Sequence, residues 1–233
     1  MRIFVLTGAG VSAESGLGTF RDPGGIWAKF DPMKLATPEG FARDPGQVHR
    51  FYNMRRANLL EAEPNPAHAA LARLEAGLAE RGGGLFLCTQ NIDDLHERAG
   101  SRAVLHMHGE LLRARCQRCD ASHGWREDLT TATVCPGCGL AGGLRPDVVW
   151  FGEVPMGLEL IDRELGRAEM FVAVGTSGAV YPAAGLVEEA RALGLRTVEL
   201  NLEPSDNAHA FDEARYGPAS EVVAAFVEEV LGR

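Results

Sequence analysis

The sequence lacks an apolar run long enough to cross a membrane, because stretches such as residues 170–174 fall far below the roughly 18 residues that a spanning helix needs. It also lacks an excess of positive charge, since 23 basic and 32 acidic residues give a formal net charge of −9. Affinity for nucleic acids depends on basic contacts to phosphates, so this balance argues against direct nucleic-acid binding. The apolar run at residues 3–6 lacks the length and the cleavage site of a secretory signal. We therefore predict a cytoplasmic protein that contacts no membrane.

Glycine and proline are too few for a disordered chain. The 28 glycines and 12 prolines among 233 residues stay below the roughly 25–30% that is typical of disorder. A hydrophobic content of 45% and a charged content of 24% are ordinary for a globular protein. A chain of this length buries roughly 70–75% of the surface that its unfolded form exposes, so it needs no disulfides to form a core. We expect a soluble, folded chain.

Short apolar runs alternate with stretches of helical periodicity along the chain. The expected strands are residues 3–7, 85–89, 170–174 and 197–201, and the expected helices are residues 47–60, 66–81, 181–193 and 220–231. Continuous apolar strands separated by helices favour an α/β fold of the Rossmann type, with a mostly parallel sheet and helices on both faces. Residues 111–146 break this rhythm and are expected to form a small zinc-binding insert. The whole chain, residues 1–233, is then one domain whose remainder is residues 1–110 and 147–233.

Four of the five cysteines have the spacing of a metal site. Cys116 and Cys119 form one Cys-x2-Cys pair, and Cys135 and Cys138 form another after 15 intervening residues. The alternatives are two disulfides or inert thiols, and disulfides are disfavoured in a reducing cytosol. Because four thiolates leave no coordination position open for water, we predict one structural Zn²⁺ ion. Cys88, in an apolar run, is expected to be a buried core residue.

A Gly-x-Gly-x-x-Ala pattern at residues 8–13 follows the first expected strand. Glycines at this point let the backbone approach a pyrophosphate, although a tight strand-to-helix turn would need the same residues. An ordinary dinucleotide-binding unit carries an acidic residue at the end of its second strand, about 20 residues on. The chain instead enters a loop at residues 19–25. This absence argues against a hydride-transferring dehydrogenase.

Small and amide-bearing residues follow three other expected strands, at residues 89–93, 175–177 and 201–203. They suit ribose hydroxyls, phosphates and an adenine edge, although each could be a capping or turn device. His108 lies between the expected sheet and the insert. A histidine there could act as a general base near neutral pH, or it could be structural.

These motifs, taken in order, closely resemble the sirtuins, a family of NAD-dependent protein lysine deacylases. The motifs are residues 8–16, 19–22, 89–93, 108–109, the two cysteine pairs and residues 175–177. Tyr52 and Arg55 resemble the Tyr-x-x-Arg pattern of the class III branch, which removes acidic acyl groups such as succinyl and malonyl. The resemblance covers nearly the whole chain. It implies a Rossmann-type NAD-binding domain and a small zinc ribbon, with NAD and acyl-lysine meeting between them.

The resemblance also implies the site residues. His108 would be the catalytic base. The NAD-binding residues would be Gly8, Ala9, Gly10, Ser12, Ala13, Glu14, Thr19, Phe20, Arg21, Trp27, Gln90, Asn91, Ile92, Asp93, Gly175, Thr176, Ser177, Asn201, Leu202, Glu203 and Ala219. The substrate-binding residues would be Ala36, Tyr52 and Arg55 for the acyl group, and Val149, Phe151 and Gly152 for a peptide added as a strand.

Spacing alone leaves the acyl site open. Tyr52 and Arg55 are three residues apart in an expected helix, so their side chains share one face. An arginine can hold a carboxylate through two charge-assisted hydrogen bonds, and a tyrosine hydroxyl can add a third. Alternatively, Arg55 is a solvated surface charge, as its neighbour Arg56 would be.

The implied reaction consumes NAD as a co-substrate. The acyl oxygen attacks C1′ of the nicotinamide ribose, nicotinamide leaves and an alkylimidate forms. His108 then acts as base on the ribose hydroxyls, and water releases free lysine and 2′-O-acyl-ADP-ribose. Two alternatives remain open: an NAD-dependent protein mono-ADP-ribosyltransferase, and a non-enzymatic NAD- or peptide-binding module on the same scaffold. We expect a monomer that acts on the acylated lysine side chains of proteins.

Overall fold

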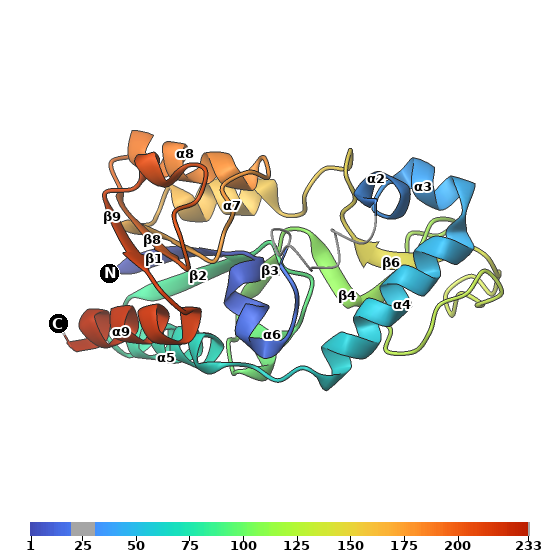
Figure 1. Ribbon diagram of the computed structural model, residues 1–233, viewed down its shortest axis with the longest axis horizontal. Helices are drawn as coiled ribbons and strands as arrows, with labels where there is room; N and C mark the ends of the chain where they lie inside the picture. Colours follow the sequence, from blue (N-terminus) through green and yellow to red (C-terminus); the bar gives the residue numbers. More distant parts are fainter. Residues whose placement is uncertain (20–30, 233) are drawn as a thin grey trace.

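The structure is a computed structural model that describes residues 1–19 and 31–232. Its larger unit is built on a six-stranded sheet. The strand order is β3-β2-β1-β7-β8-β9, and all neighbouring strands run parallel. The strands are β1 (Arg2–Thr7), β2 (Gly84–Thr89), β3 (Val104–His106), β7 (Met170–Val174), β8 (Arg196–Asn201) and β9 (Glu213–Tyr216). This is the Rossmann order, in which the direction of winding reverses beside the first strand. The predicted α/β fold is confirmed (Figure 1).

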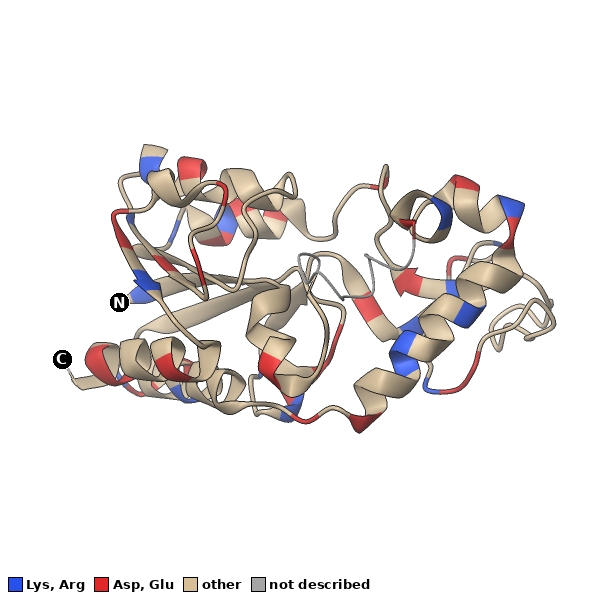
Figure 2. Cartoon of the chain, viewed as in Figure 1, with Lys and Arg blue, Asp and Glu red and all other residues tan. Residues whose placement is uncertain are grey.

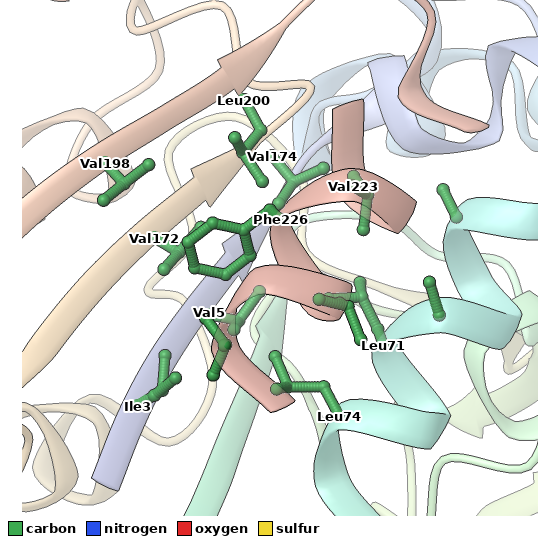
Figure 3. Close-up of a cluster of buried hydrophobic side chains, with 14 of the residues drawn as sticks. Ile3, Val5, Leu71, Leu74, Val172, Val174, Val198, Leu200, Val223 and Phe226 are labelled. Atoms are coloured by element: carbon green, nitrogen blue, oxygen red, sulfur yellow. The ribbon is translucent and has the colours of Figure 1, made fainter. Parts of the chain in front are cut away.

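Helices cover both faces of this sheet (Figure 1). One face carries α5 (Pro66–Glu80) and α9 (Ala219–Gly232), and the other carries α7 (Leu158–Leu165) and α8 (Leu186–Ala192). Along β1, Ile3 and Val5 pack with the side chains of α5 and α9 (Figure 3), whereas Phe4 and Leu6 pack with those of α7 and α8. A strand that is buried on both faces needs a continuous apolar run. This is why polar and apolar residues do not alternate along β1.

The sequence predicted one continuous helix where the structure has two shorter ones, and it did not predict the two edge strands of the sheet. The helix expected over residues 181–193 is divided into a 3-10 helix, η2 (Ala183–Gly185), and α8. The strands β3 and β9, at the two edges of the sheet, have only 3 and 4 residues, which is too short for a periodic signal. Three further short helices connect the larger elements: η1 (Ala9–Ser15), α6 (Leu95–Arg98) and η3 (Ala208–Ala210).

A smaller unit is built on an antiparallel three-stranded sheet of order β5-β4-β6. Its strands are β4 (Gly109–Cys116), β5 (Ser122–Gly124) and β6 (Leu144–Val148). Helices α2 (Pro32–Leu35), α3 (Pro38–Arg43) and α4 (Pro45–Glu61) lie beside this sheet (Figure 1). They share a hydrophobic cluster with it, in which Phe41 and Phe51 join Leu111 and Val148. Residues 32–61 therefore pack with the smaller unit, in addition to the insert expected at residues 111–146.

Four successive helices, α2 to α5, begin with a capping side chain followed by proline. Asp31, Thr37, Asp44 and Asn65 each accept a hydrogen bond from a backbone N–H of the first helical turn. Proline fits the first helical position, because the N–H that it lacks has no partner there. Each pair thus marks where its helix begins. Within the described ranges, no helix combines the length and the apolar character needed to cross a membrane.

Candidate active site

A cleft of about 950 Å³ lies between the two units. One wall consists of residues that follow the carboxyl ends of β1, β2, β7 and β8, and the other includes residues of α4 and β6. The cleft is lined by His108 and by every predicted NAD-, acyl- and peptide-binding residue that the structure describes. Phe20, Arg21 and Trp27 lie outside the described residues. Segments that are far apart in the sequence are thus brought to one surface.

Two glycine turns meet where the strand order reverses, at the ends of β1 and β7. The Gly8 N–H donates to the Val174 carbonyl, and the Gly10 N–H donates to the Gly175 carbonyl, each at 2.9 Å. A Cβ atom on Gly10 would lie 2.7 Å from the Gly175 Cα, which is too close for any side chain. These glycines therefore have a packing role as well as the predicted contact with a pyrophosphate.

His108 follows β3 and lies in the turn into β4. Its Nδ1 lies 3.0 Å from the carbonyl oxygen of Gln90. Because a carbonyl only accepts, Nδ1 carries the proton and Nε2 keeps a lone pair. Burial lowers the pKa of His108 below its ordinary value, and the opposing bond to Gln90 does not reverse this. The imidazole is therefore neutral near pH 7 and can accept a proton at Nε2.

His106, two residues earlier, has a different role. Its Nδ1 lies 3.2 Å from the Asn91 carbonyl oxygen, and its Nε2 lies 2.8 Å from Glu97 Oε1. Burial opposes the charged ring, but the hydrogen bond to Glu97 and its charge raise the pKa of His106 above its ordinary value. His106 does not line the cleft. It instead holds the backbone of the loop that carries Asn91.

The buried Ser12 hydroxyl joins three segments behind the cleft. It donates to Asp93 Oδ2 and accepts from Asn91 Nδ2, each at 3.1 Å. His68 Nδ1 accepts from the Asn65 N–H at 3.3 Å, so His68 Nε2 carries the proton and donates to Ser12 Oγ at 3.3 Å. Burial is the largest effect on Asp93 and raises the pKa of its carboxyl. The network fixes the orientations of Asn91 and Asp93.

At the far end of the cleft, two predicted NAD-binding residues also connect secondary-structure elements. The Glu14 carboxylate accepts from the Ser220 hydroxyl at 2.6 Å and from its N–H at 2.9 Å, which lowers the pKa of Glu14. Glu14 thereby ties η1 to the start of α9, beside Ala219. Asn201 Nδ2 donates to the Thr176 carbonyl at 2.7 Å and links the ends of β7 and β8.

The acyl end of the cleft includes Ala36, Tyr52 and Arg55. The centre of the Arg55 guanidinium lies 5.9 Å from the centroid of the Tyr52 ring, as expected for two side chains on one helix face. The Tyr52 hydroxyl accepts a hydrogen bond from Trp150 Nε1–H at 3.0 Å. This end of the cleft thus offers a half-buried cation near the Tyr52 ring, whose hydroxyl accepts from Trp150.

Arg56 is buried and fastens α4 to the smaller sheet. Its Nε donates to the Leu111 carbonyl at 3.2 Å, and its Nη1 donates to Asn53 Oδ1 at 2.9 Å. Asn53 also exchanges two hydrogen bonds with the backbone of Leu129, each at 2.9 Å. The alternative in which Arg55 and Arg56 are both solvated surface charges is therefore wrong.

The segment predicted to pair with a peptide forms the turn after β6. The Val149 N–H donates to the His108 carbonyl at 2.8 Å, and the Phe151 N–H donates to the Ala36 carbonyl at 2.9 Å. Gly152 has a φ of +88° and open space where a Cβ would lie. Pairing with a peptide must therefore use backbone groups other than these two N–H donors.

The four paired cysteines meet at one point of the smaller unit, and their sulfur atoms all lie within 4.8 Å of one another. The Cys116–Cys138 and Cys119–Cys135 sulfur distances are 3.9 and 3.8 Å, far longer than a disulfide bond. Four sulfurs placed tetrahedrally at about 2.3 Å from Zn²⁺ would be about 3.8 Å apart. The cysteines therefore fit one structural zinc ion, as predicted, and Cys88 is buried, also as predicted.

Comparison with known proteins identifies the family. The Sir2 family model matches residues 8–182. The chain belongs to the Sir2 family. It is 62% identical over 233 residues to the NAD-dependent protein deacylase of Caulobacter vibrioides, covering 100% of this chain and 98% of that protein. The predicted resemblance to the sirtuins is thus confirmed.

Two solved sirtuin structures share this fold. One is a complex of a Sir2 homologue with NAD, which has a TM-score of 0.86 and 40% identity, covering 98% of this chain and 89% of that chain. The other is Sir2 bound to acetylated peptide, with a TM-score of 0.82 and 30% identity, covering 99% of this chain and 93% of that chain.

Sequence reasoning missed two contacts of this sirtuin that fix side chains of the site. Trp150 contacts Tyr52 across 98 positions of the chain, and His68 contacts Ser12 across 56. No local pattern marks such a contact, because it exists only after the two units have packed. The one available signal was that His68 follows Asn65 by three residues, the spacing of a capping box.

Proposed function

We propose that this sirtuin removes acyl groups from protein lysines and consumes one NAD for each acyl group removed. The observation that carries the proposal is the single cleft, which contains His108, the glycine turns and the Tyr52–Arg55 pair. The name of the Caulobacter relative and the solved complexes with NAD and with acetylated peptide support the same activity.

In the proposed reaction, acyl-lysine, NAD and water give free lysine, nicotinamide and O-acyl-ADP-ribose. The acyl group moves from the lysine nitrogen to a ribose oxygen, and no atom changes its oxidation state through hydride transfer. His108 supports this step because its Nδ1 proton is held by Gln90, which leaves Nε2 to remove a proton from a ribose hydroxyl. Asn91 and Asp93, fixed by Ser12, would position the nicotinamide ribose.

We further propose that the protein accepts acidic acyl groups such as succinyl. The Arg55 guanidinium can bind a carboxylate through two charge-assisted hydrogen bonds, and the Tyr52 hydroxyl can donate a third. Ala36 leaves room for a longer acyl chain than a larger residue would. Hydrogen bonds to charged groups contribute roughly 1.5–3 kcal/mol each, enough for about tenfold to hundredfold selectivity.

The macromolecular partner in this proposal is an acylated protein or peptide. Val149, Phe151 and Gly152 lie at the cleft and would contact the peptide backbone on either side of the modified lysine. Residues of both units of one chain line the cleft, and we propose that the protein acts as a monomer.

A product analysis tests the proposal. The purified protein is incubated with NAD and either a succinyl-lysine or an acetyl-lysine peptide, and all products are identified by mass spectrometry. We expect equal amounts of nicotinamide, O-acyl-ADP-ribose and free-lysine peptide. ADP-ribose attached to protein while the acyl group stays on the lysine would indicate a transferase instead, and unconsumed NAD would indicate a binding module.

A further inference from the structure

The Trp150 indole determines whether the Tyr52 hydroxyl accepts or donates in the hydrogen bond between them. The two side chains are each only 2% exposed, and Trp150 Nε1 lies 3.0 Å from the Tyr52 oxygen. An indole nitrogen can only donate, so the phenol oxygen must accept this bond. Among the residues that the structure describes, no acceptor binds the phenol's own proton. Tyr52 and Arg55 line the same cleft, so a carboxylate bound there would offer this proton an acceptor.

Trp150 is itself held rigidly. The centre of the Arg145 guanidinium lies 3.3 Å from the centroid of the Trp150 ring, and Phe41 packs against the same ring at 5.3 Å between centroids. Arg145 donates to both Glu153 oxygens at 2.6 and 2.9 Å, and Glu153 in turn accepts the Trp150 backbone N–H at 2.8 Å. The indole N–H therefore reaches Tyr52 from a fixed position.

The paired charges also keep Arg145 out of substrate binding. Its side chain is 4% exposed, its charge is matched by Glu153, and it does not line the cleft. Arg55 does line the cleft and is the cation there that lies beside the Tyr52 ring. An acidic acyl group would thus meet Arg55 and the Tyr52 hydroxyl, while Arg145 acts only on Trp150.

We infer that Trp150 is a positioning residue for acidic acyl groups: its indole N–H holds the Tyr52 hydroxyl so that the phenol donates to the carboxylate bound by Arg55. This inference rests on the proposed acidic-acyl activity. A neutral acetyl group has no carboxylate to receive the phenol proton. Loss of the indole N–H should therefore affect succinyl-lysine and spare acetyl-lysine, whereas loss of a merely structural residue should affect both.

The test is Trp150→Phe, which keeps an aromatic ring and removes the N–H. We expect kcat/KM for succinyl-lysine peptide to fall by roughly threefold to tenfold, mainly through KM, because a remote binding contact is lost. The value for acetyl-lysine peptide should change by less than about twofold, as expected for a bond that acetyl cannot use. In a Tyr52→Phe background the same change should have no further effect on the succinyl-to-acetyl ratio, since the hydroxyl is already absent.

Two further variants keep the result unambiguous. Phe41→Leu loosens the packing of Trp150 but keeps its N–H, so it should lower the succinyl-to-acetyl ratio less than Trp150→Phe does. If Trp150→Phe does not fold, as judged by thermal unfolding, a benzothiophene analogue of tryptophan at position 150 keeps the ring shape and removes only the N–H. Equal losses on both peptides, or additive losses in the Tyr52→Phe background, would overturn the inference. If the wild-type protein removes acetyl but no succinyl, the proposed acidic-acyl activity itself fails, which is distinct from a failure of the role of Trp150.

Discussion

The larger and smaller units are stabilised by different interactions. The six-stranded sheet lies between two extended clusters of buried apolar side chains. One lies under α5 and α9 (Figure 3), and the other lies under α7 and α8. The zinc-binding end of the smaller unit has a buried cluster of only five residues, Ala114, Cys116, Leu129, Cys135 and Leu144. So small an apolar core cannot stabilise a fold without a metal or another cross-link. Apolar burial stabilises the first unit and the part of the second unit around α4, whereas the zinc-binding end depends on its four cysteines.

Both units contribute residues to the cleft. The predicted cofactor residues follow strands of the larger sheet, whereas Tyr52, Arg55 and Trp150 belong to the smaller unit, in which α4 carries several basic residues (Figure 2). Changes in the smaller unit should therefore alter acyl selection, and changes near the larger sheet should alter the use of NAD. The predictions below test this division.

The largest effect is expected from loss of the metal. Cys135→Ser should lower the zinc content from about one ion per chain to none and unfold residues 111–146, because structural zinc contributes folding free energy directly. The larger sheet has its own apolar cores and should keep its slow hydrogen exchange. Metal analysis, deacylation assays and hydrogen exchange by mass spectrometry provide the measurements.

The matched control for Cys135→Ser is Cys88→Ala, which removes a buried cysteine outside the cluster and should retain zinc. Deacylation that persists after verified removal of zinc would contradict the prediction. Loss of slow exchange throughout the six-stranded sheet would show that the two units do not have independent cores.

The second-largest effect is expected from the loss of His108, the proposed general base. His108→Ala should lower turnover at least ~10²-fold, the low end of what loss of a general base costs, while NAD affinity stays nearly unchanged. Steady-state kinetics and calorimetric titration with NAD measure the two quantities separately. His106→Gln, two residues away, leaves the His108 ring in place and should cost less turnover. A loss that lies chiefly in NAD affinity would contradict the assignment of His108 as the base.

The third effect is on selectivity and arises in the smaller unit. Arg55→Met should reduce desuccinylation at least ~10-fold, because charge-assisted hydrogen bonds to the acyl carboxylate are lost. Deacetylation should fall much less, since an acetyl group has no carboxylate. Competition between the two peptides in one reaction, followed by mass spectrometry, gives the ratio directly. Equal losses on both peptides would show that Arg55 does not bind the acyl carboxylate.

The same division explains what could be predicted from the sequence. The runs at β1, β2, β7 and β8 identified the sheet because strands buried on both faces need unbroken apolar residues, and the spacing of Cys116, Cys119, Cys135 and Cys138 identified the metal site. Nothing local indicated that residues 32–61 pack with the smaller unit, because that packing involves β4 and β6, far along the chain. Arg56 looked solvated for the same reason: its partners, such as the Leu111 carbonyl, are distant in sequence.

The smallest expected effect is on the pH dependence of stability. It concerns one buried histidine in each unit, His49 and His68. Burial lowers the pKa of His49 in the smaller unit and of His68 in the larger unit to about 4, and the nearby charge of Arg56 adds to the effect on His49. An unfolded histidine titrates near 6.5, so between pH 6.5 and 4 the unfolded chain binds more protons than the folded chain. The free energy of unfolding therefore falls as the pH falls through this window, by about 1 kcal/mol per pH unit for each histidine.

His49→Leu should remove one of these two contributions. His49 packs edge-on against Phe41, and among the described residues its Nδ1 has no hydrogen-bond partner, so an apolar side chain forfeits no hydrogen bond at that atom. Urea unfolding at pH 6.5, 5.5 and 4.5 should show a slope against pH that is about 1 kcal/mol per unit shallower than in the wild type. His209 is exposed, so His209→Gln is the control and should leave the slope unchanged. An unaltered slope in His49→Leu would mean that His49 is not held neutral in the folded protein.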